Sequence, residues 1–499
     1  DVYKRQHYIS PDVMDSVESK KALFRETFLS NRQAVMFDAD SSAPTGEADA
    51  KTAYVNSVLD DNDKARLFSD CWMDAFIAKR CVVLPEWAED YVPTTLTIDQ
   101  PVDEQTLYQI ISQHEDVVHV DTSQMEIIQQ MAIIGPNQVG PVTLLAGPVT
   151  IYQDESKLEI TLCKPERYYR DPMVADVKDG MWAGVMMDIP RGTLKEMGYD
   201  PEQVDGLAND YRWRTDEIDY ARKAHDQSHS TQKQVSRSDD TENITFYKTW
   251  SWLNLADETV DDGNGGVIDF PDEFKLWEIH WAGGEVMRYE DGNVAIREAS
   301  EIPFIEWCEY RLPHAEHGMA DADIMAHSQK TSSVLKRLVI DNQQMRNTSR
   351  MEAVQQNLLN PRDLLDNEIG GVVWTEQIGS VAPIPTPELS PMTMGVLQML
   401  DMDGEKRSGL SSLGKGMNSD VLRAQNAADM VERLTNAGTR RPIQAARDWA
   451  ESFLIPLCQK IVKIAMENDK RSRRVEVSGQ IVMINPQQWS DKLLSMSVA

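Results

Sequence analysis

The strongest constraint on the fold is a helical pattern that runs through residues 321–347, DADIMAHSQKTSSVLKRLVIDNQQMRN. The segment is long enough for about seven helical turns. Residues three or four positions apart lie on one face of this helix. That face mixes Leu335 and Leu338 with polar residues such as Ser328 and Asn342. A free-standing globular helix needs a more apolar face. A helix that packs against copies of itself around a wet channel tolerates this one, so the pattern favours an assembled helix.

A second helix is predicted over residues 392–407, where Val396 and Leu400 are apolar. Between the two helices lies a short, turn-rich insert, residues 348–391, which ends in the proline cluster PIPTPELSP. Proline removes a backbone donor and clashes with the preceding turn, so this cluster is not helical. We therefore expect the two helices to form an antiparallel pair with the insert at its tip.

The rest of the chain mixes helical and strand patterns. Residues 1–92 are predicted to be mostly helical, and residues 93–320 are predicted to be β-rich because short β-branched segments alternate there with turn residues. Residues 423–469 predict a long helix that Pro442 and Pro456 begin, kink or break. The fold class is therefore α+β.

Composition limits the possible partners. Hydrophobic residues make up 41% of the 499 residues, so a sizeable core can form. The 81 acidic residues outnumber the 50 basic ones, which gives a formal net charge of −31. Such a surface repels nucleic acid at long range and argues against tight non-specific DNA binding. It does not exclude a protein that DNA passes without sticking.

Cysteine usage and hydropathy point to an intracellular place of synthesis and to no membrane partner. The five cysteines are scattered and form no C-x-x-C motif, which is typical of reduced thiols. No stretch approaches 18 consecutive apolar residues, so no membrane-spanning helix is predicted.

One segment approaches a nucleotide-binding motif. Residues 409–416, GLSSLGKG, match a P-loop up to its last position, where Gly416 replaces the hydroxyl residue that would hold Mg²⁺. A P-loop also follows a buried strand, whereas the preceding residues are helical and then charged. A flexible loop between helices explains the segment better than a site that uses Lys415.

Two further segments approach metal-binding motifs, and each lacks a residue that its motif requires. In HEDVVH, residues 114–119, the second histidine is one position too late for a zinc site on a helix. The stretch from Asp262 to Glu273 lacks the EF-hand glycine, because Val267 stands there, and a hairpin turn at Asn264 and Gly265 explains it better. We therefore expect no catalytic residue, no metal ligand and no cofactor, as in a structural or assembly protein.

Several longer segments resemble the portal, or head-to-tail connector, proteins of tailed bacteriophages, specifically the short-tailed podovirus type. The segments are IPFIEW, RLPHAEHGMADADIMAHSQKTSSVLKRLVIDN, LLNPRDLLDNEIGGVVWT and RSGLSSLGKGMNSDVLRAQNAADMV. Upstream, CKPERYYRDPMVADVKDGMWAGVMMDIPRGTLKEMGYDPEQVD resembles the wing of the same family. The resemblance covers nearly the whole chain in colinear order, and proteins of this family extend upstream of Asp1 and past Ala499.

The resemblance implies a portal fold with a helical and β-rich wing, an antiparallel stem pair, a small α/β clip and a long helix after a tunnel loop. Its implied segments are a wing at 1–320 (helical 1–92, β-rich 93–320), a stem helix at 321–347, a clip at 348–391, a second stem helix at 392–407, a tunnel loop at 408–422, a long wing helix at 423–469 and a further β element at 470–499.

The resemblance also implies partners. It predicts a homo-oligomeric ring of about twelve subunits at one capsid vertex of the virion, assembled in the cytoplasm of the bacterial host. The implied partners are the terminase, the capsid and scaffolding proteins, tail adaptor proteins and double-stranded DNA in the channel. The alternatives are another phage head–tail structural protein, or a nucleotide-dependent enzyme that uses Lys415.

Candidate site residues follow from these placements. A solvated charged face is the simpler interpretation of the cations of the tunnel loop and its flanks, and the alternative is that they make brief phosphate contacts. They are Lys406, Arg407, Lys415 and Arg423. The residues expected to dock partners at the clip are Arg350, Arg362 and Trp374. The residues expected to pack the stem are Leu335, Leu338 and Leu400.

Overall fold

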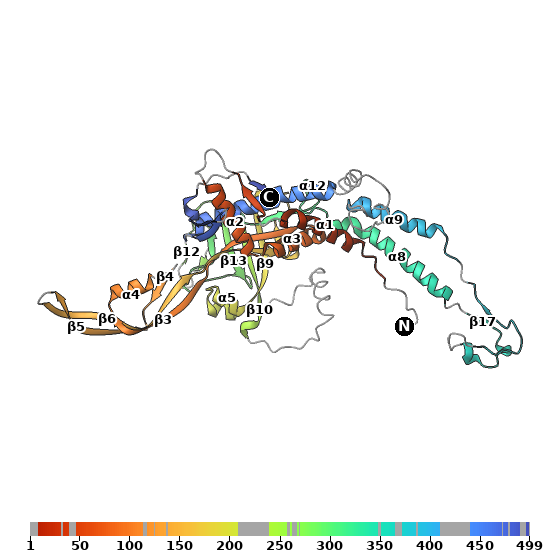
Figure 1. Ribbon diagram of the computed structural model, residues 1–499, viewed down its shortest axis with the longest axis horizontal. Helices are drawn as coiled ribbons and strands as arrows, with labels where there is room; N and C mark the ends of the chain where they lie inside the picture. Colours follow the sequence, from red (N-terminus) through yellow and green to blue (C-terminus); the bar gives the residue numbers. More distant parts are fainter. Residues whose placement is uncertain are drawn as a thin grey trace.

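A computed structural model gives the architecture of the chain. It describes residues 8–30, 33–38, 46–112, 117–123, 125–135, 138–207, 239–256, 260–261, 267–268, 270–347, 351–364, 372–385, 388–409, 440–471, 473–477, 480–489 and 496–498. A central body carries two projections that leave it on opposite sides (Figure 1). One projection is a β-arm, and the other is a helix pair with a small segment at its far end.

The body has a helical layer built by α1 (Asp12–Leu29), α2 (Glu47–Asp61), α3 (Lys64–Ala78) and α13 (Ile455–Asn468). Aromatic rings fill its centre. Trp72 and Trp449 are fully buried and meet edge to face at 5.5 Å, and Phe24 lies 5.5 Å from Trp72. Edge-to-face pairs add about 0.5–1.5 kcal/mol beyond the burial of their area. The core therefore joins the N-terminal helices to residues almost 400 positions later.

The prediction that residues 1–92 are helical is wrong at its C-terminal end. Helix α3 ends because Lys79 adopts a left-handed backbone conformation with φ of 78°. Strand β2 (Cys81–Ala88) follows, and β3 (Tyr91–Val102) begins three residues after β2 ends. The β-branched run in CVVLPEWA pairs with β7 (Lys157–Cys163) and β16 (Ile305–Trp307), which are distant in sequence.

A second layer of the body is a six-stranded antiparallel sheet. Its central strands are β9 (Trp182–Pro190), β10 (Asn243–Leu253) and β13 (Lys275–Ala282), flanked by β8 (Tyr168–Arg170), β14 (Glu285–Val286) and β15 (Ile296–Glu298). Alternating residues of β10 face opposite sides. On one side Tyr247 stacks on Trp281 across the strands at 3.9 Å, and on the other Phe246 and Trp250 are buried.

Short helices border this sheet. They are α5 (Arg191–Glu196) and α6 (Pro201–Gly206), as the prolines at 190 and 201 indicate, because proline is favoured at a helix start. The buried His280 links them to the sheet: Tyr199 Oη lies 2.7 Å from its Nδ1, and Glu278 Oε1 lies 2.8 Å from its Nε2.

The β-arm is a four-stranded sheet built around β6 (Gln138–Asp154). Its other strands are β3, β4 (Val117–Asp121) and β5 (Glu126–Gly135), and α4 (Glu104–Ile111) packs on it. Figure 1 shows β5 and β6 reaching farthest from the body.

The other projection is formed by α8 (Asp321–Asn347) and α9 (Met392–Ser408), which run side by side (Figure 1). At their far end β17 (Met351–Ala353) pairs with β18 (Val381–Pro383), between short 3-10 turns. The described residues of this end segment contain no α-helix, so they differ from the small α/β unit expected at 348–391. The prolines and the short apolar runs of the end segment explain this difference, because proline disrupts the interior of a helix.

The helix predicted at 423–469 is described only from residue 440. There α12 (Arg440–Trp449) continues into a π-helical turn at Ala450–Leu454 and then into α13. Pro456 neither ends nor breaks this helix. It has no amide hydrogen to donate to the carbonyl of residue 452, and the wider π-turn just before it makes room for its ring.

The described residues of the C-terminal segment, where a further β element is expected at 470–499, contain three strands. Strands β19 (Arg473–Val477) and β20 (Gln480–Ile484) form a hairpin, but β21 (Met496–Val498) pairs with β1 (Val35–Phe37) near the N-terminus. Such a pairing joins residues more than 450 positions apart, which no local pattern reveals.

A buried charge cluster anchors α8 to the body. Lys20 Nζ of α1 donates to Glu309 Oε1 at 2.5 Å and to Asp321 Oδ1 at 2.6 Å, and Ser16 Oγ donates to the other Asp321 oxygen at 2.5 Å. All three charged side chains are at most 1% exposed. Burial lowers the pKa of Lys20, but Glu309 and Asp321 outweigh it and hold the pKa above its ordinary value.

Replacing Lys20 with Met should therefore destabilise the protein by about 3–5 kcal/mol, because two carboxylates would remain buried without their cation. Chemical denaturation monitored by circular dichroism measures the loss. The neighbouring Lys21→Met is the matched control: its pair with Glu18 lies at the surface, so it should cost less than about 1 kcal/mol. Equal losses in the two variants would show that the buried cluster has no special role.

Candidate functional site

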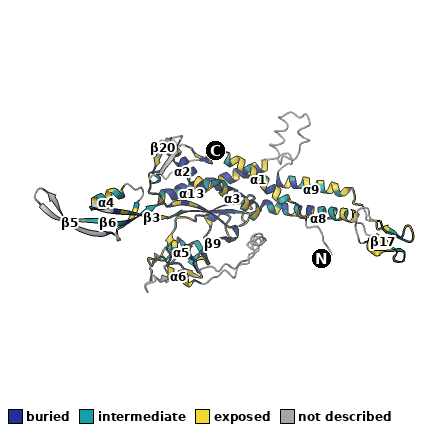
Figure 2. Ribbon diagram, turned by 60° about the horizontal axis from the view of Figure 1, so that its bottom comes forward, coloured by how far each residue is buried: buried dark blue, intermediate teal, exposed yellow. Residues whose placement is uncertain are grey.

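Both helices of the projection expose apolar side chains along one side, in an unbroken row on α9 and in a row that Asp341 and Asn342 interrupt on α8. On α9 the stripe consists of Met392, Val396, Met399 and Met402, which are 80%, 44%, 71% and 55% exposed. Their spacing of three or four residues places them on one side of the helix. Figure 2 shows exposed residues along α9, whereas the buried residues concentrate in the body. Contiguous apolar surface of this kind marks an interaction site.

On α8 the exposed stripe consists of Val334, Leu338 and Met345, at 53%, 55% and 59%. The three residues predicted to pack the stem thus differ in exposure. Leu335 and Leu400 are half-buried, and Leu338 lies in the exposed stripe. The stripes are therefore available to partners outside the single chain.

The far end segment is also rich in exposed apolar side chains. Trp374 is 66% exposed, Ile378 is fully exposed and Leu359 is 61% exposed. Arg362, one of the predicted docking residues, is exposed on the same segment, and Arg350 lies outside the described residues. Aromatic and Arg side chains are the types that dominate binding energy at interfaces.

Of the four cations assigned to the loop, the structure describes two. Lys406 and Arg407 are exposed in the last turn of α9, where cations suit the helix dipole, and Arg407 pairs with Asp403 at 2.8 Å. Lys415 and Arg423 lie outside the described residues. Arg441 Nη1 donates to the carbonyl oxygen of Lys406 at 3.0 Å, so the start of α12 meets the end of α9.

The local structure argues against the P-loop. Gly409 closes α9 in a left-handed conformation, and its amide donates to the Glu405 carbonyl at 3.0 Å. A helix therefore precedes the glycine-rich stretch, where a P-loop requires a strand. Within the described ranges no cluster of three potential metal ligands occurs, and no helix is long and apolar enough to cross a bilayer.

Comparison with known families decides the class of the protein. Residues 3–498 match the family described as Phage SU10 portal protein. The chain belongs to this family. It is therefore a structural portal component of phage, as the resemblance predicted. Portal families in general form oligomeric rings in the virion capsid and contact terminase and tail proteins. No curated protein matches the chain.

Sequence reasoning missed some of these features. The methionines of α9 recur at helical spacing and were a usable signal for the stripe. Arg441 carried no local signal, because its contact with the end of α9 spans residues that the sequence separates by 35 positions. The same holds for Lys20, whose partners come about 300 positions later.

Replacing Leu338 with Asp should weaken self-association about tenfold or more, because a charge would enter an apolar contact. The fold should stay intact, since the side chain is 55% exposed in the single chain. Analytical ultracentrifugation measures the association, and circular dichroism checks the fold. Gln343→Asp, five residues along on another side of α8, is the matched control and should assemble normally.

Proposed function

We propose that the chain forms a closed ring of about twelve copies at one capsid vertex, as the channel for double-stranded DNA during packaging and ejection. The observation that best supports this proposal is the pair of exposed apolar stripes on α8 and α9. In a cyclic ring each copy offers a different surface to each neighbour, so the stripe of one helix can pack on the stripe of the other.

In this proposal α8 and α9 are the stem helices that surround the channel. Together they carry six acidic and six basic residues, so the strong negative charge of the chain lies elsewhere. A wall that is neutral on balance neither concentrates nor strongly repels phosphate, and a duplex can slide along it.

The far end segment acts in this proposal as the clip. Its exposed Trp374 and neighbouring apolar side chains dock the terminase during packaging and tail adaptor proteins afterwards. The body and the β-arm form the wing, which meets capsid and scaffolding proteins. Assembly takes place in the host cytoplasm, and the ring then remains at the vertex of the virion.

Negative-stain electron microscopy of the purified chain tests the proposal. We expect rings whose central hole is at least as wide as a DNA duplex. A species that remains monomeric in every buffer would overturn the channel. A ring without an open centre would favour the alternative, another head–tail structural protein.

Replacing Lys406 and Lys415 with Ala should change DNA retention or packaging efficiency while ring assembly is spared. The reason is that phosphate contacts at the loop affect the passage of DNA rather than the contacts between subunits. Packaging assays and electron microscopy of the same preparation measure the two effects. Failure of the variant to form rings would show that these lysines are structural.

The enzyme alternative has its own test. Titration with ATP should show no saturable binding, because the loop follows a helix and lacks the hydroxyl for Mg²⁺. Binding that the Lys415→Ala variant loses would support a nucleotide-dependent enzyme.

A further inference from the structure

A buried histidine lies at the centre of the contact between the α5–α6 segment and the six-stranded sheet. His280 of β13 is 3% exposed, and both of its ring nitrogens have partners. Tyr199 Oη lies 2.7 Å from Nδ1, and Glu278 Oε1 lies 2.8 Å from Nε2. An ionised carboxylate only accepts hydrogen bonds, so Nε2 carries the hydrogen, and in a neutral ring Nδ1 accepts from the Tyr199 hydroxyl.

The charges that face the ring favour its neutral form. Glu278 supplies a negative charge, but its Oε1 also accepts from Arg297 of β15 at 3.2 Å. Lys248 of β10 lies directly opposite His280 in the strand register. Burial lowers the pKa of His280, and Lys248 and Arg297 lower it further, although Glu278 acts against them. The ring is therefore hard to protonate while the contact is closed.

The backbone of His280 joins the same segments. Its amide donates to the Ala295 carbonyl at 3.0 Å, and its carbonyl accepts from the Met287 amide at 2.9 Å. Tyr289, just after Met287, stacks on Tyr199 with ring centroids 5.1 Å apart. His280 thus holds together β13, the segment that carries Met287 and Ala295, and the loop between α5 and α6.

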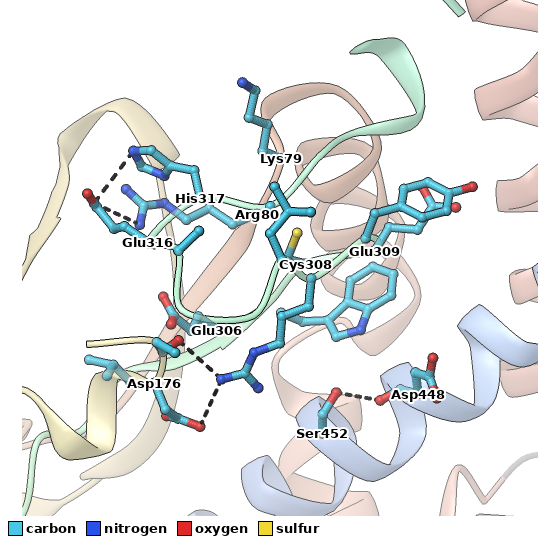
Figure 3. A pocket seen from close by; sticks show the side chains of 18 of the residues that line it. Lys79, Arg80, Asp176, Glu306, Cys308, Glu309, Glu316, His317, Asp448 and Ser452 are labelled. Carbon is cyan, nitrogen blue, oxygen red and sulfur yellow. Dashed lines mark hydrogen bonds and ion pairs between the residues drawn. The ribbon is translucent and has the colours of Figure 1, made fainter. Parts of the chain in front are cut away.

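A second histidine shows what distinguishes this contact. His317 lines a pocket of about 930 Å³ between the 308–319 connection and the helix around the π-turn (Figure 3). Its side chain is 53% exposed, and its Nε2 lies 3.5 Å from Glu316 Oε1, which is also 3.7 Å from Arg80 Nη1. These distances exceed those of good hydrogen bonds. Water can solvate the His317 ring in either charge state, so its protonation loosens no buried contact.

We propose that the contact between Tyr199 and His280 is an acid-sensitive latch: when the His280 ring takes up one proton from solvent, residues 191–207 detach more readily from the six-stranded sheet. Nδ1 then carries a hydrogen and no longer accepts from the Tyr199 hydroxyl. The added charge faces Lys248 and lies among apolar groups such as Phe246, whose ring centroid is 5.6 Å away. Opening relieves this cost, because the charged ring regains water.

The pH range of the latch follows from the two states of the ring. In the open state His280 regains its ordinary pKa of 6.5, and in the closed state its pKa lies lower. The latch therefore stabilises the contact fully above pH 6.5 and loses that contribution as the pH falls further. From about pH 7.5 to about pH 5.5, the population of the open state should rise up to about tenfold.

The acid beside the ring does not titrate in this range. Burial opposes the ionisation of Glu278, but the hydrogen bond from His280 and the charge of Arg297 outweigh it and lower the pKa of Glu278 to about 2. A response between about pH 7.5 and about pH 5.5 at this contact therefore reports on the histidine alone.

Hydrogen–deuterium exchange followed by mass spectrometry tests the latch in the whole chain, because local opening controls the exchange of amides. After correction for the intrinsic rate at each pH, exchange in residues 191–207 should rise about fivefold to tenfold from about pH 7.5 to about pH 5.5. Helix α3 lies outside the contact and gives the baseline. The His280→Gln variant cannot be protonated and should lose the response, whereas His317→Gln, the matched control, should keep it.

An equal response in the His280→Gln variant and the unchanged protein would overturn the latch, and so would no response in either. If circular dichroism shows that His280→Gln does not fold, deuterium exchange at the imidazole Cε1 hydrogens of the unchanged protein gives the titration directly. The His280 ring should titrate below pH 6.5, and titration at or above that pH would contradict the proposal. None of these results depends on ring assembly, so the proposed function stands or falls separately.

Discussion

The architecture depends on one buried ion cluster. Lys20 of α1 holds Glu309 from the end of β16 and Asp321 from the first turn of α8. Three segments distant in sequence thus meet at one ammonium group. The arrangement is costly to desolvate, and the hydroxyl of Ser16 and the two short Lys20 bonds offset that cost. Because Asp321 is the first residue of α8, the cluster fixes where the helix pair leaves the body.

The surfaces that follow from this geometry are incomplete in a single chain. The helix pair projects away from the body, so its apolar stripes have no partner within the protomer among the described residues. Beside the base of the same helix, Arg170 donates to the backbone carbonyls of Val174 and Glu316 and so ties neighbouring segments of the body together. Membership of the Phage SU10 portal family fits these exposed stripes, because portal families in general form oligomeric rings.

Local patterns predicted the long elements well and failed where pairing is distant. The helices at 321–347 and 392–408 are present because the hydrogen bonds of a helix join residues only four positions apart, so a local pattern can predict them. Residues 81–88 fall in the region predicted to be mostly helical, yet they form β2, because their β-branched residues pair with β7 and β16, which are distant in sequence. The strand pair β1–β21 was missed for the same reason, since strand pairing leaves no trace in the neighbouring residues.

The sequence by itself determined the class of fold, the half-polar long helix and its companion, the failure of the P-loop and metal motifs, and the family. These properties depend on residue type and short spacing. Only the tertiary structure decided which leucines face outward, that Lys20 is buried between two acids, and that β21 pairs with β1. Burial and long-range contact are properties of the folded chain, because they depend on which distant segments pack together.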